Sequence, residues 1–314
     1  MTRSNTIHPS FAALKRSAAN RFALPRTLPF TLLTTLTLPT ALTLLTALLF
    51  SAGCASMQSD VEMKAQTAAA IAEASMGKHR SETNIARNVA RHPVETLTFF
   101  GLESDMTVIE VLPGSALWYS EIIAPVVRDE GQLIIADYDV DLPDQPEYRL
   151  KGRNAMLERF EKQADVFGAP KIVKMTAPQS IDLGADGSVD MVLTFRSTHG
   201  WIRDDAAEAA YAAFFDVLKP GGVLGVVQHR ASDDTDTTQF NGYVAEDRLI
   251  AIAEGAGFVL EASSDVNANP KDKANYEGGV WTLPPRLRLG DVDKAKYLAI
   301  GESDRMTLRF RKPS

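Results

Sequence analysis

Apolar runs of strand length recur from residue 107 to the end of the chain and alternate with stretches of helical pattern. The runs lie at Thr107–Leu112, Gln132–Ala136, Lys171–Met175, Met191–Phe195, Val223–Val227, Phe258–Ala262 and Met306–Arg311. The helical stretches between them lie at Ser120–Val127, Asn154–Phe167, Ala206–Leu218 and Ala245–Ala256. Buried strands that alternate with amphipathic helices form a mostly parallel sheet with helices on both faces. The pattern therefore predicts an α/β fold with a doubly wound, seven-stranded sheet.

The region before the first strand has a helical pattern. Val61–Ser75 is rich in Ala and free of Gly and Pro, and it contains few large apolar residues. We therefore expect a helix that forms a stalk or an arm lying on the main domain. Pro93 and Gly101 bracket a further helix, with Pro in its first turn and Gly at its end. The predicted organisation is a tether and helical arm over 54–90 and a main domain over 91–314.

The first 53 residues have the pattern of a targeting segment. Residues 1–59 contain five basic residues and no acidic one, and the 23 residues Leu28–Phe50 are uncharged. Ala52-Gly53-Cys54 follows and resembles the lipobox of a bacterial lipoprotein signal peptide, although Ser51 stands where such motifs usually have Leu. That resemblance implies a signal peptide of lipoprotein type over 1–53 and acylation of Cys54. The protein would then be lipid-anchored in the bacterial cell envelope, facing the periplasm. The alternative is an uncleaved transmembrane anchor, since 23 uncharged residues can span a bilayer.

The charge and the cysteine content argue against several kinds of partner and site. The net charge of the 314 residues is −7, but the chain after residue 59 contains 28 basic residues and all 40 acidic ones, a net of −12. Such a body argues against a nucleic-acid partner bound by clustered Lys and Arg. Cys54 is the only cysteine, which excludes an intramolecular disulfide and a Cys-based zinc site. No two histidines have the close helical spacing of a zinc motif, so we expect no metal.

The turns after the first two strands carry candidate binding residues. Glu110 ends the first buried run, and Gly114 and Ser115 follow in a tight turn before a helix. Ligands of open parallel sheets bind beyond the carboxyl ends of the strands, where small residues let the backbone approach them. The second strand leads to Asp137, where such folds place a carboxylate that accepts hydrogen bonds from ribose hydroxyls. We prefer Asp137 to Asp139 because it follows the apolar run directly; a solvated loop acid is the alternative.

Three phrases in order resemble class I S-adenosylmethionine-dependent methyltransferases. They are the acid-and-glycine turn from Glu110 to Ala116, the phrase Asp186-Gly187-Ser188-Val189-Asp190 before the fourth strand, and Lys219-Pro220-Gly221-Gly222 before the fifth. The resemblance extends from His92 to Arg311 and implies a Rossmann-like fold. It also implies S-adenosyl-L-methionine as the cofactor, with Glu110, Gly114, Ser115 and Asp137 as its binding residues. The turn departs from the family pattern of alternating glycines, because Leu112 and Ala116 replace the outer two.

Further phrases are similar to a bacterial family of predicted exported methyltransferases whose substrate is not established. They begin at Arg91-His92-Pro93, Thr194-Phe195-Arg196, Gln228-His229-Arg230, Asn267-Ala268-Asn269 and Gly279-Val280-Trp281. Typical members have a first turn that is richer in Gly and one residue shorter. They also commonly have Asp at the position of Gln228. These differences bear on the inference that the chain binds the cofactor, and they leave the inference of the fold unchanged.

Four side chains at strand ends are the candidate catalytic residues. Arg196 and His199 follow the fourth strand, and His229 and Arg230 follow the fifth, so the fold brings all four to the edge that carries Gly114. Methyl transfer from a sulfonium needs chiefly alignment of donor and acceptor, with a base only where the acceptor loses a proton. Histidine can supply that base, and arginine can orient a carboxylate or phosphate. Alternatively, both histidines are structural and bond to loop backbone.

The tryptophans and one late segment complete the candidates. Trp118, Trp201 and Trp281 each lie beside one of these phrases, where an aromatic face either stacks on a ligand or packs in the core. Asn267–Pro285 is too irregular for a strand, and we expect it either to fold over the strand ends as a lid or to form a loop held by its polar side chains.

Three functions fit these residues. The first is an exported S-adenosylmethionine-dependent methyltransferase that acts on a small molecule or an envelope component. The second is a methyltransferase-like domain without catalysis that binds a ligand or partner. The loss of two glycines from the first turn, at Leu112 and Ala116, favours this function. The third is an enzyme of this fold with another cofactor or none, in which His199 and His229 act as acid and base. The expected partners are a small-molecule substrate and a membrane reached through the lipid anchor, and the oligomeric state is left open.

Overall fold

The computed structural model describes residues 61–314. The expected signal peptide over 1–53, the lipidation site Cys54 and the start of the tether lie outside the described residues. Within the described part, no helix is both long and apolar enough to cross a membrane.

The core of the fold is one mixed sheet of eight strands in the order β4-β3-β2-β1-β5-β6-β8-β7. The order reverses around β1, which lies between β2 and β5 and pairs with both in parallel, Val111 facing Ala136 on one side and Thr194 on the other. The crevice outside the carboxyl ends of these strands is therefore the place where an open α/β sheet binds ligands. The strands are β1 (Thr107–Val111), β2 (Gln132–Asp137), β3 (Lys171–Thr176), β4 (Ser180–Asp182), β5 (Val189–Phe195), β6 (Leu218–His229), β7 (Val259–Ser264) and β8 (Arg305–Arg311).

The expectation of seven strands was wrong by one strand. All seven predicted apolar runs form strands, and the mostly parallel part runs from β3 through β6, while β8 is antiparallel to both β6 and β7. The additional strand, β4, pairs antiparallel with the edge of β3 through Lys174 and Asp182. It has three residues and none of them is buried, so it leaves no apolar run in the sequence.

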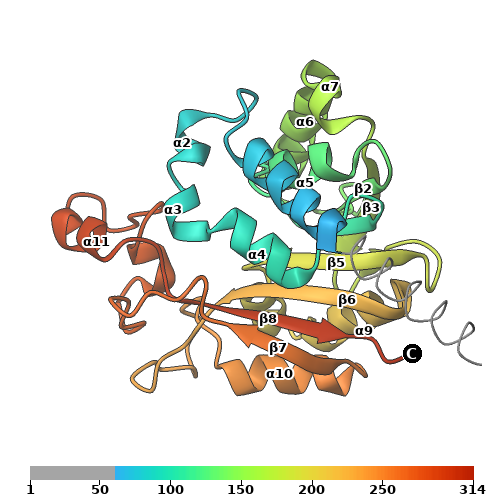
Figure 1. Cartoon of the computed structure of the whole chain (residues 1–314). Coiled ribbons are helices and arrows are strands. Elements are labelled where there is room, and N and C mark those ends of the chain that lie inside the picture. The colour runs from blue at the N-terminus through green and yellow to red at the C-terminus, as the bar shows by residue number, and fades with distance from the viewer. Residues whose placement is uncertain (1–60) are drawn as a thin grey trace, which may run out of the picture. The chain divides into compact units, whose positions relative to one another are not determined.

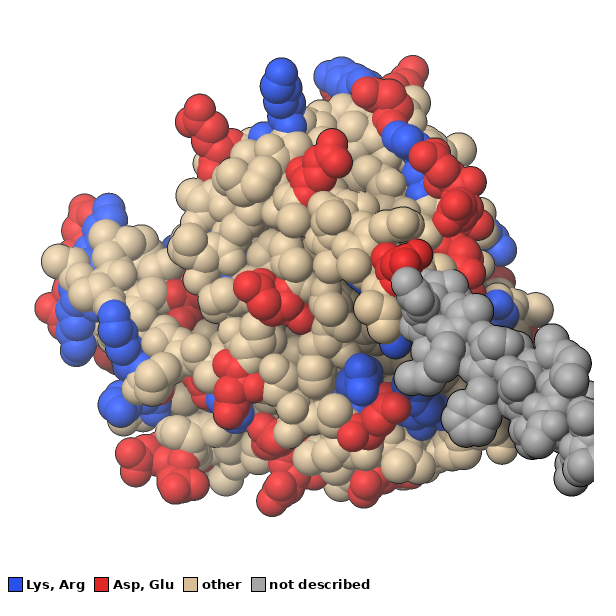
Figure 2. Space-filling model, in the orientation of Figure 1, with Lys and Arg blue, Asp and Glu red and all other residues tan. Residues whose placement is uncertain are grey.

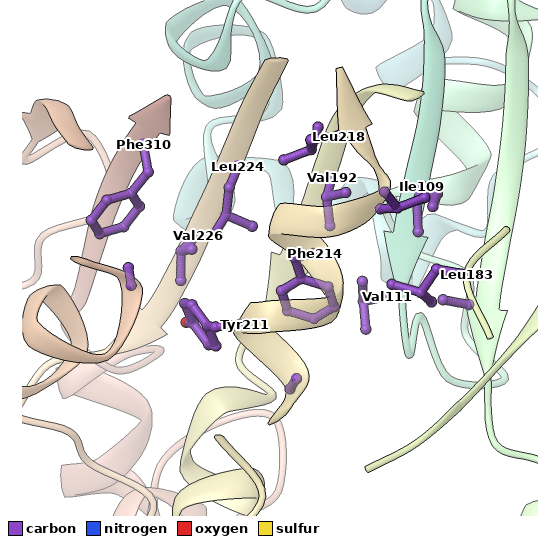
Figure 3. Packing of buried hydrophobic residues seen from close by; sticks show 14 of the residues in the cluster. Ile109, Val111, Leu183, Val192, Tyr211, Phe214, Leu218, Leu224, Val226 and Phe310 are labelled. Carbon is purple, nitrogen blue, oxygen red and sulfur yellow. The ribbon is translucent and has the colours of Figure 1, made fainter. Parts of the chain in front are cut away.

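Helices cover both faces of the sheet, α4 and α5 on one side and α9 and α10 on the other (Figure 1). Alanines give α9 a high helix propensity, and its buried residues recur at intervals of three and four. Tyr211 and Phe214 on that face are fully buried against Val192 and Leu224 of the sheet (Figure 3). Burial of each large side chain stabilises the fold by roughly 1.5–3 kcal/mol. Apart from the helix over 61–75, the longer helices are α4 (Pro93–Phe100), α5 (Ser120–Val127), α6 (Glu147–Lys162), α9 (Ala207–Val217) and α10 (Glu246–Gly255). The shorter ones are α2 (Glu82–Ile85), α3 (Asn88–Arg91), α7 (Ala164–Phe167), α8 (Thr198–Arg203), η1 (Gly279–Thr282) and α11 (Lys294–Ile300).

The described part of the expected arm lies on the main domain. A helix over 61–75 packs its fully buried Ile71 into the cluster beneath α4 and α5. Arg80 follows, and its Nε donates to Oε2 of the buried Glu121 of α5 at 3.1 Å, while its guanidinium carbon lies 4.7 Å from the Trp118 ring centre. Asn84 Nδ2 donates to the same Oε2 at 2.8 Å. These buried polar contacts fix residues 80–91 at the end of the sheet where α11 also lies (Figure 1).

The surface carries both signs of charge. On the face shown in Figure 2, acidic and basic side chains are interspersed over the described residues. Several charged side chains are buried inside the molecule, among them Arg91, Glu110 and Arg305.

Candidate functional site

Two adjoining cavities lie at the carboxyl ends of the central strands. The first has a volume of about 360 Å³ and includes Arg87, Arg91 and Glu302, and we call it the arginine cavity. The second has a volume of about 530 Å³ and includes Gly114 and Asp137, and we call it the turn cavity. Their volumes are in the range of small-molecule sites. The residues that line both cavities are Leu112, Arg196, Ser197, His199 and Trp281.

The first turn keeps a glycine-like backbone in spite of its sequence. Leu112, which stands where the resembling family has Gly, has φ of +48°, and its N–H donates to the Ala136 carbonyl at 2.8 Å. Gly114 has φ of +66°, and a Cβ added to it would meet no heavy atom within 4 Å, so its open side faces the turn cavity. Ser115 is exposed and lines neither cavity. The conformation that glycine favours is thus retained at Leu112 at the cost of backbone strain.

Glu110 lies behind this turn and lines neither cavity. Its carboxylate is buried and accepts a hydrogen bond from Ser120 Oγ at 2.5 Å. Burial raises the pKa of Glu110 to about 7, although the Ser120 hydrogen bond and the charges of Arg196 and Arg91 lower it. The predicted role of Glu110 as a direct ligand has no support in this position, because the side chain is enclosed within the fold.

Of the two acids after β2, Asp137 is the one at a cavity. It lines the turn cavity, and its Oδ2 accepts a hydrogen bond from Arg153 Nε at 2.7 Å. Asp139 lines neither of the two cavities. Its Oδ2 accepts from Ser180 Oγ at 2.7 Å and lies 3.0 Å from Lys174 Nζ, contacts that fix the β3–β4 edge.

His199 lies in the first turn of the short helix α8 and lines both cavities. Its Nδ1 is 3.3 Å from Gln228 Nε2, and its ring centre is 5.8 Å from that of Trp281. Burial lowers the pKa of His199 to about 4, so the imidazole is neutral at pH 7. Gln228, which stands where the resembling family commonly has Asp, thus provides an amide that bonds to the histidine.

His229 ends β6 and lines only the arginine cavity. Its Nδ1 is 2.6 Å from Ser303 Oγ, and its ring centre is 5.8 Å from that of His199. Burial lowers the pKa of His229 well below its usual value, and the nearby His199, Arg196 and Arg305 lower it further. The two histidines predicted from separate strands thus meet as a pair of neutral imidazoles.

The two candidate arginines have different surroundings. Arg196 has φ of +64° and lines both cavities, and burial lowers its pKa to about 10. Within residues 61–314 its guanidinium forms no hydrogen bond or ion pair. Arg230 lines neither cavity, because Asp304 takes its guanidinium in a two-bond pair at 2.8 and 3.2 Å and Asp265 lies 3.1 Å from it. Arg196 is thus available to a ligand, whereas Arg230 ties β6 to the following loops.

An ion cluster in the arginine cavity was not predicted. Glu302 Oε1 accepts from Arg87 Nε at 2.6 Å, and its Oε2 lies 3.3 Å from Arg91 Nε and 3.2 Å from Arg305 Nη1. Burial by itself raises the pKa of Glu302, but the arginines around it hold the pKa at about 2. One member of the cluster, Arg91, lies in a sequence phrase singled out above, but that phrase does not indicate Glu302 as its partner.

The tryptophans lie partly at the cavities and partly in the core, and the segment 267–285 both covers the strand ends and forms a loop held by polar contacts. Trp281 and Trp118 line the arginine cavity, whereas Trp201 is buried in the core and also borders the turn cavity. The segment 280–286 forms one wall of the arginine cavity and so covers the strand ends. Upstream in the same segment, Asn269 Nδ2 donates to the carbonyls of Ile300 and Glu302 at 2.9 and 2.6 Å, which is a loop-stabilising contact.

No cluster of three or more His, Cys, Asp or Glu side chains among the described residues is arranged to hold a metal ion.

Comparison with known proteins shows no family for this chain. No protein-family model matches the chain, and no curated protein matches its sequence. Solved structures that resemble it include a SAM-dependent methyltransferase from Aquifex aeolicus (16% identity, 72% of this chain and 93% of that one, TM-score 0.49) and the [4+2]-cyclase SpnF (15%, 71% and 82%, 0.47). A SAM-dependent methyltransferase from Methanosarcina mazei has 11% identity, 69% and 97% coverage, and a TM-score of 0.44. At these values we rest the fold on the strand order described above, which is α/β and Rossmann-like with a mixed, eight-stranded sheet.

Proposed function

We propose that this protein is an S-adenosylmethionine-dependent methyltransferase that acts on a small molecule. The observation that carries the proposal is the pair of cavities at the switch point of the sheet, joined by the wall that contains Arg196 and His199. A methyl transferase needs two ligands side by side with their reacting atoms aligned. In this chain the turn cavity is the donor site and the arginine cavity is the acceptor site.

The residues of the turn cavity fit the donor. Gly114 leaves the backbone of the first turn open to a ligand, and Asp137 offers a carboxylate to ribose hydroxyls. Met175 and Ala177 supply apolar surface for a flat base, and Arg196 can pair with the carboxylate of the amino-acid portion. When bound there, S-adenosylmethionine would supply an activated methyl group on a sulfonium.

The chain itself contributes alignment and a neutral base. Arg196 and His199 line both cavities, so their side chains can hold a donor and an acceptor in register. His199 and His229 are neutral at pH 7, so each can accept a hydrogen bond or a proton from an acceptor atom as it is methylated. The left-handed backbone retained at Leu112 supports donor binding against the alternative of a domain that has lost it.

Calorimetric titration of the full chain with S-adenosylmethionine and S-adenosylhomocysteine tests the donor site. We expect both to bind, and Gly114→Arg to abolish binding because the new side chain enters the turn cavity. Gly187→Arg is a matched control, since Gly187 has φ of +63° and an equally open Cβ position but lines neither cavity. Absence of binding at millimolar ligand, or retained binding in Gly114→Arg, refutes the donor site. Binding without methyl transfer to any acceptor would favour the non-catalytic alternative.

We further propose that the protein is exported and lipid-anchored in the bacterial envelope. The support is in the sequence: the uncharged run from Leu28 to Phe50, the small residues before Cys54, and the absence of acids before residue 60. Mass spectrometry of the mature N-terminus tests this. A diacylated chain that begins at Cys54 is expected, and an unmodified chain that begins earlier would contradict the proposal.

A further inference from the structure

The arginine cavity contains more positive than negative charge. Arg87, Arg91 and Arg305 all pair with the single carboxylate of Glu302. Arg196 lines the same cavity and has no acidic partner among the described residues. Several cations that share one anion in a partly buried space repel one another, and burial raises the cost of each charge. The cluster is thus short of negative charge.

Two of these arginines also have N–H groups without acceptors. Arg87 Nη2 and Arg91 Nη1 are buried and form no hydrogen bond with any described residue. A buried donor without a partner destabilises the fold, and a charged donor does so more strongly. Burial, with Arg196 nearby, lowers the pKa of Arg91 well below its usual value, which reflects the same deficit. An anion in the cavity would satisfy both the charges and the unpaired donors.

We propose that the methyl acceptor carries a carboxylate or phosphate group, which Arg87 and Arg91 bind in the arginine cavity, with Arg196 at the border to the turn cavity. This proposal rests on the proposed methyl transfer for its second ligand, but the anion site itself does not depend on it. Guanidinium groups bind such anions through paired N–H donors. The other wall of the cavity is apolar and aromatic, with Phe195 and Trp281 among its residues, so the anion is attached to an apolar or aromatic body.

The donor also has a carboxylate, and the cavity walls separate the two sources. Arg87 and Arg91 line only the arginine cavity, whereas Arg196 lines both. A donor carboxylate in the turn cavity can reach Arg196 but not the other two. Substitution of Arg87 therefore reports on the acceptor alone.

An anionic acceptor would also change the histidines. The positive charges of Arg196, Arg305 and Arg91 help to keep the pKa of His229 low. A bound anion offsets these charges, so it makes the imidazoles stronger bases when the acceptor is present. The acceptor would thereby prepare the site for its own deprotonation.

Calorimetric titration of the full chain with phenyl phosphate, benzoate and the neutral benzamide tests the proposal. Each titration is done with and without saturating S-adenosylhomocysteine, so that failure of the donor site does not hide the anion site. We expect at least one of the two anions to bind at least tenfold more tightly than benzamide. Equal affinity for the neutral and the anionic probes would overturn the proposal, and this comparison needs no variant.

Arg87→Gln should weaken binding of the preferred anion about tenfold and leave the affinity for S-adenosylhomocysteine within a factor of two. Arg87→Lys should retain part of the anion affinity, because it keeps the charge. The control is Lys151→Gln, which removes the same unit of charge from the exposed face of α6. If Arg87→Gln weakens S-adenosylhomocysteine as much as the anion, the arginines serve the donor and the proposal is wrong. It is equally wrong if folded Arg87→Gln binds the anion like the unchanged protein.

Discussion

Glu110 makes the stability of this fold depend on pH. Burial in the sheet raises its pKa from the ordinary value of 4.5 to about 7, and the Ser120 hydrogen bond and nearby arginines oppose this only in part. A carboxyl whose pKa is higher in the folded state keeps its proton after the unfolded chain has lost it. The stability contributed by the protonated form is therefore complete below pH 4.5 and is lost as the pH rises to 7.

The expected size of this loss follows from the two pKa values. A rise from 4.5 to about 7 corresponds to about 3 kcal/mol in the free energy of unfolding. Glu110→Gln does not titrate, and its amide oxygen can still accept the Ser120 hydrogen bond. The free energy of unfolding of the variant, relative to the unchanged protein, should thus increase by about 3 kcal/mol between pH 4.5 and 7.5.

Guanidinium unfolding at a series of pH values measures this difference. Other titrating groups, including His199 and His229, change both proteins equally and cancel in the comparison. Glu208→Gln, at an exposed position in the first turn of α9, is the control whose difference should stay flat. If the stability curves of Glu110→Gln and the unchanged protein run parallel over this range, Glu110 is not the buried, proton-binding group described here.

Three further predictions concern packing and binding. Glu121→Gln leaves Arg80 buried without a countercharge, so thermal unfolding should show a loss of about 3–5 kcal/mol; a loss below about 1 kcal/mol would contradict the buried pair. Gly225→Ala places a Cβ 2.6 Å from Leu193 Cδ2 and 2.8 Å from the Phe100 ring, so urea unfolding should show a loss of about 1–3 kcal/mol, whereas unchanged stability would mean that both side chains move aside freely. Asp137→Asn should weaken S-adenosylhomocysteine binding about tenfold in calorimetry, because a charged acceptor of a hydrogen bond is lost, while the circular dichroism spectrum stays unchanged. Unaltered affinity would mean that Asp137 does not bind the ligand.

The sheet was predictable because its strands are short apolar runs that alternate with helical stretches, a pattern typical of a parallel sheet covered by helices. Every predicted run, from Thr107 to Arg311, is a strand, and α5 begins and ends where its pattern predicts. β4 was missed because three partly exposed residues at an edge carry no hydrophobic signal. α8 was missed because its six residues make fewer than two helical turns, too few for a helical pattern of apolar residues to recur.

The sequence predicted only those residues of the candidate site that lie at the carboxyl ends of strands. His199, His229 and Arg196 come together because the carboxyl ends of β5 and β6 meet at one edge. Arg230 follows the same strand end, but an ion pair with Asp304 turns it away from both cavities, and no sequence pattern indicates that pair. The cluster around Glu302 was missed for the same reason, because its members lie far apart in the chain.

The bond between Arg87 and Glu302 joins residues 215 positions apart. A chain that folds as it is synthesised from its N-terminus cannot complete the arginine cavity until residue 302 has been made. The next element, β8, is also the strand that connects β6 to β7 in the sheet. Residues 302–311 therefore complete both the sheet and the cavity, so any product that ends before residue 302 lacks the ion cluster and the strand together.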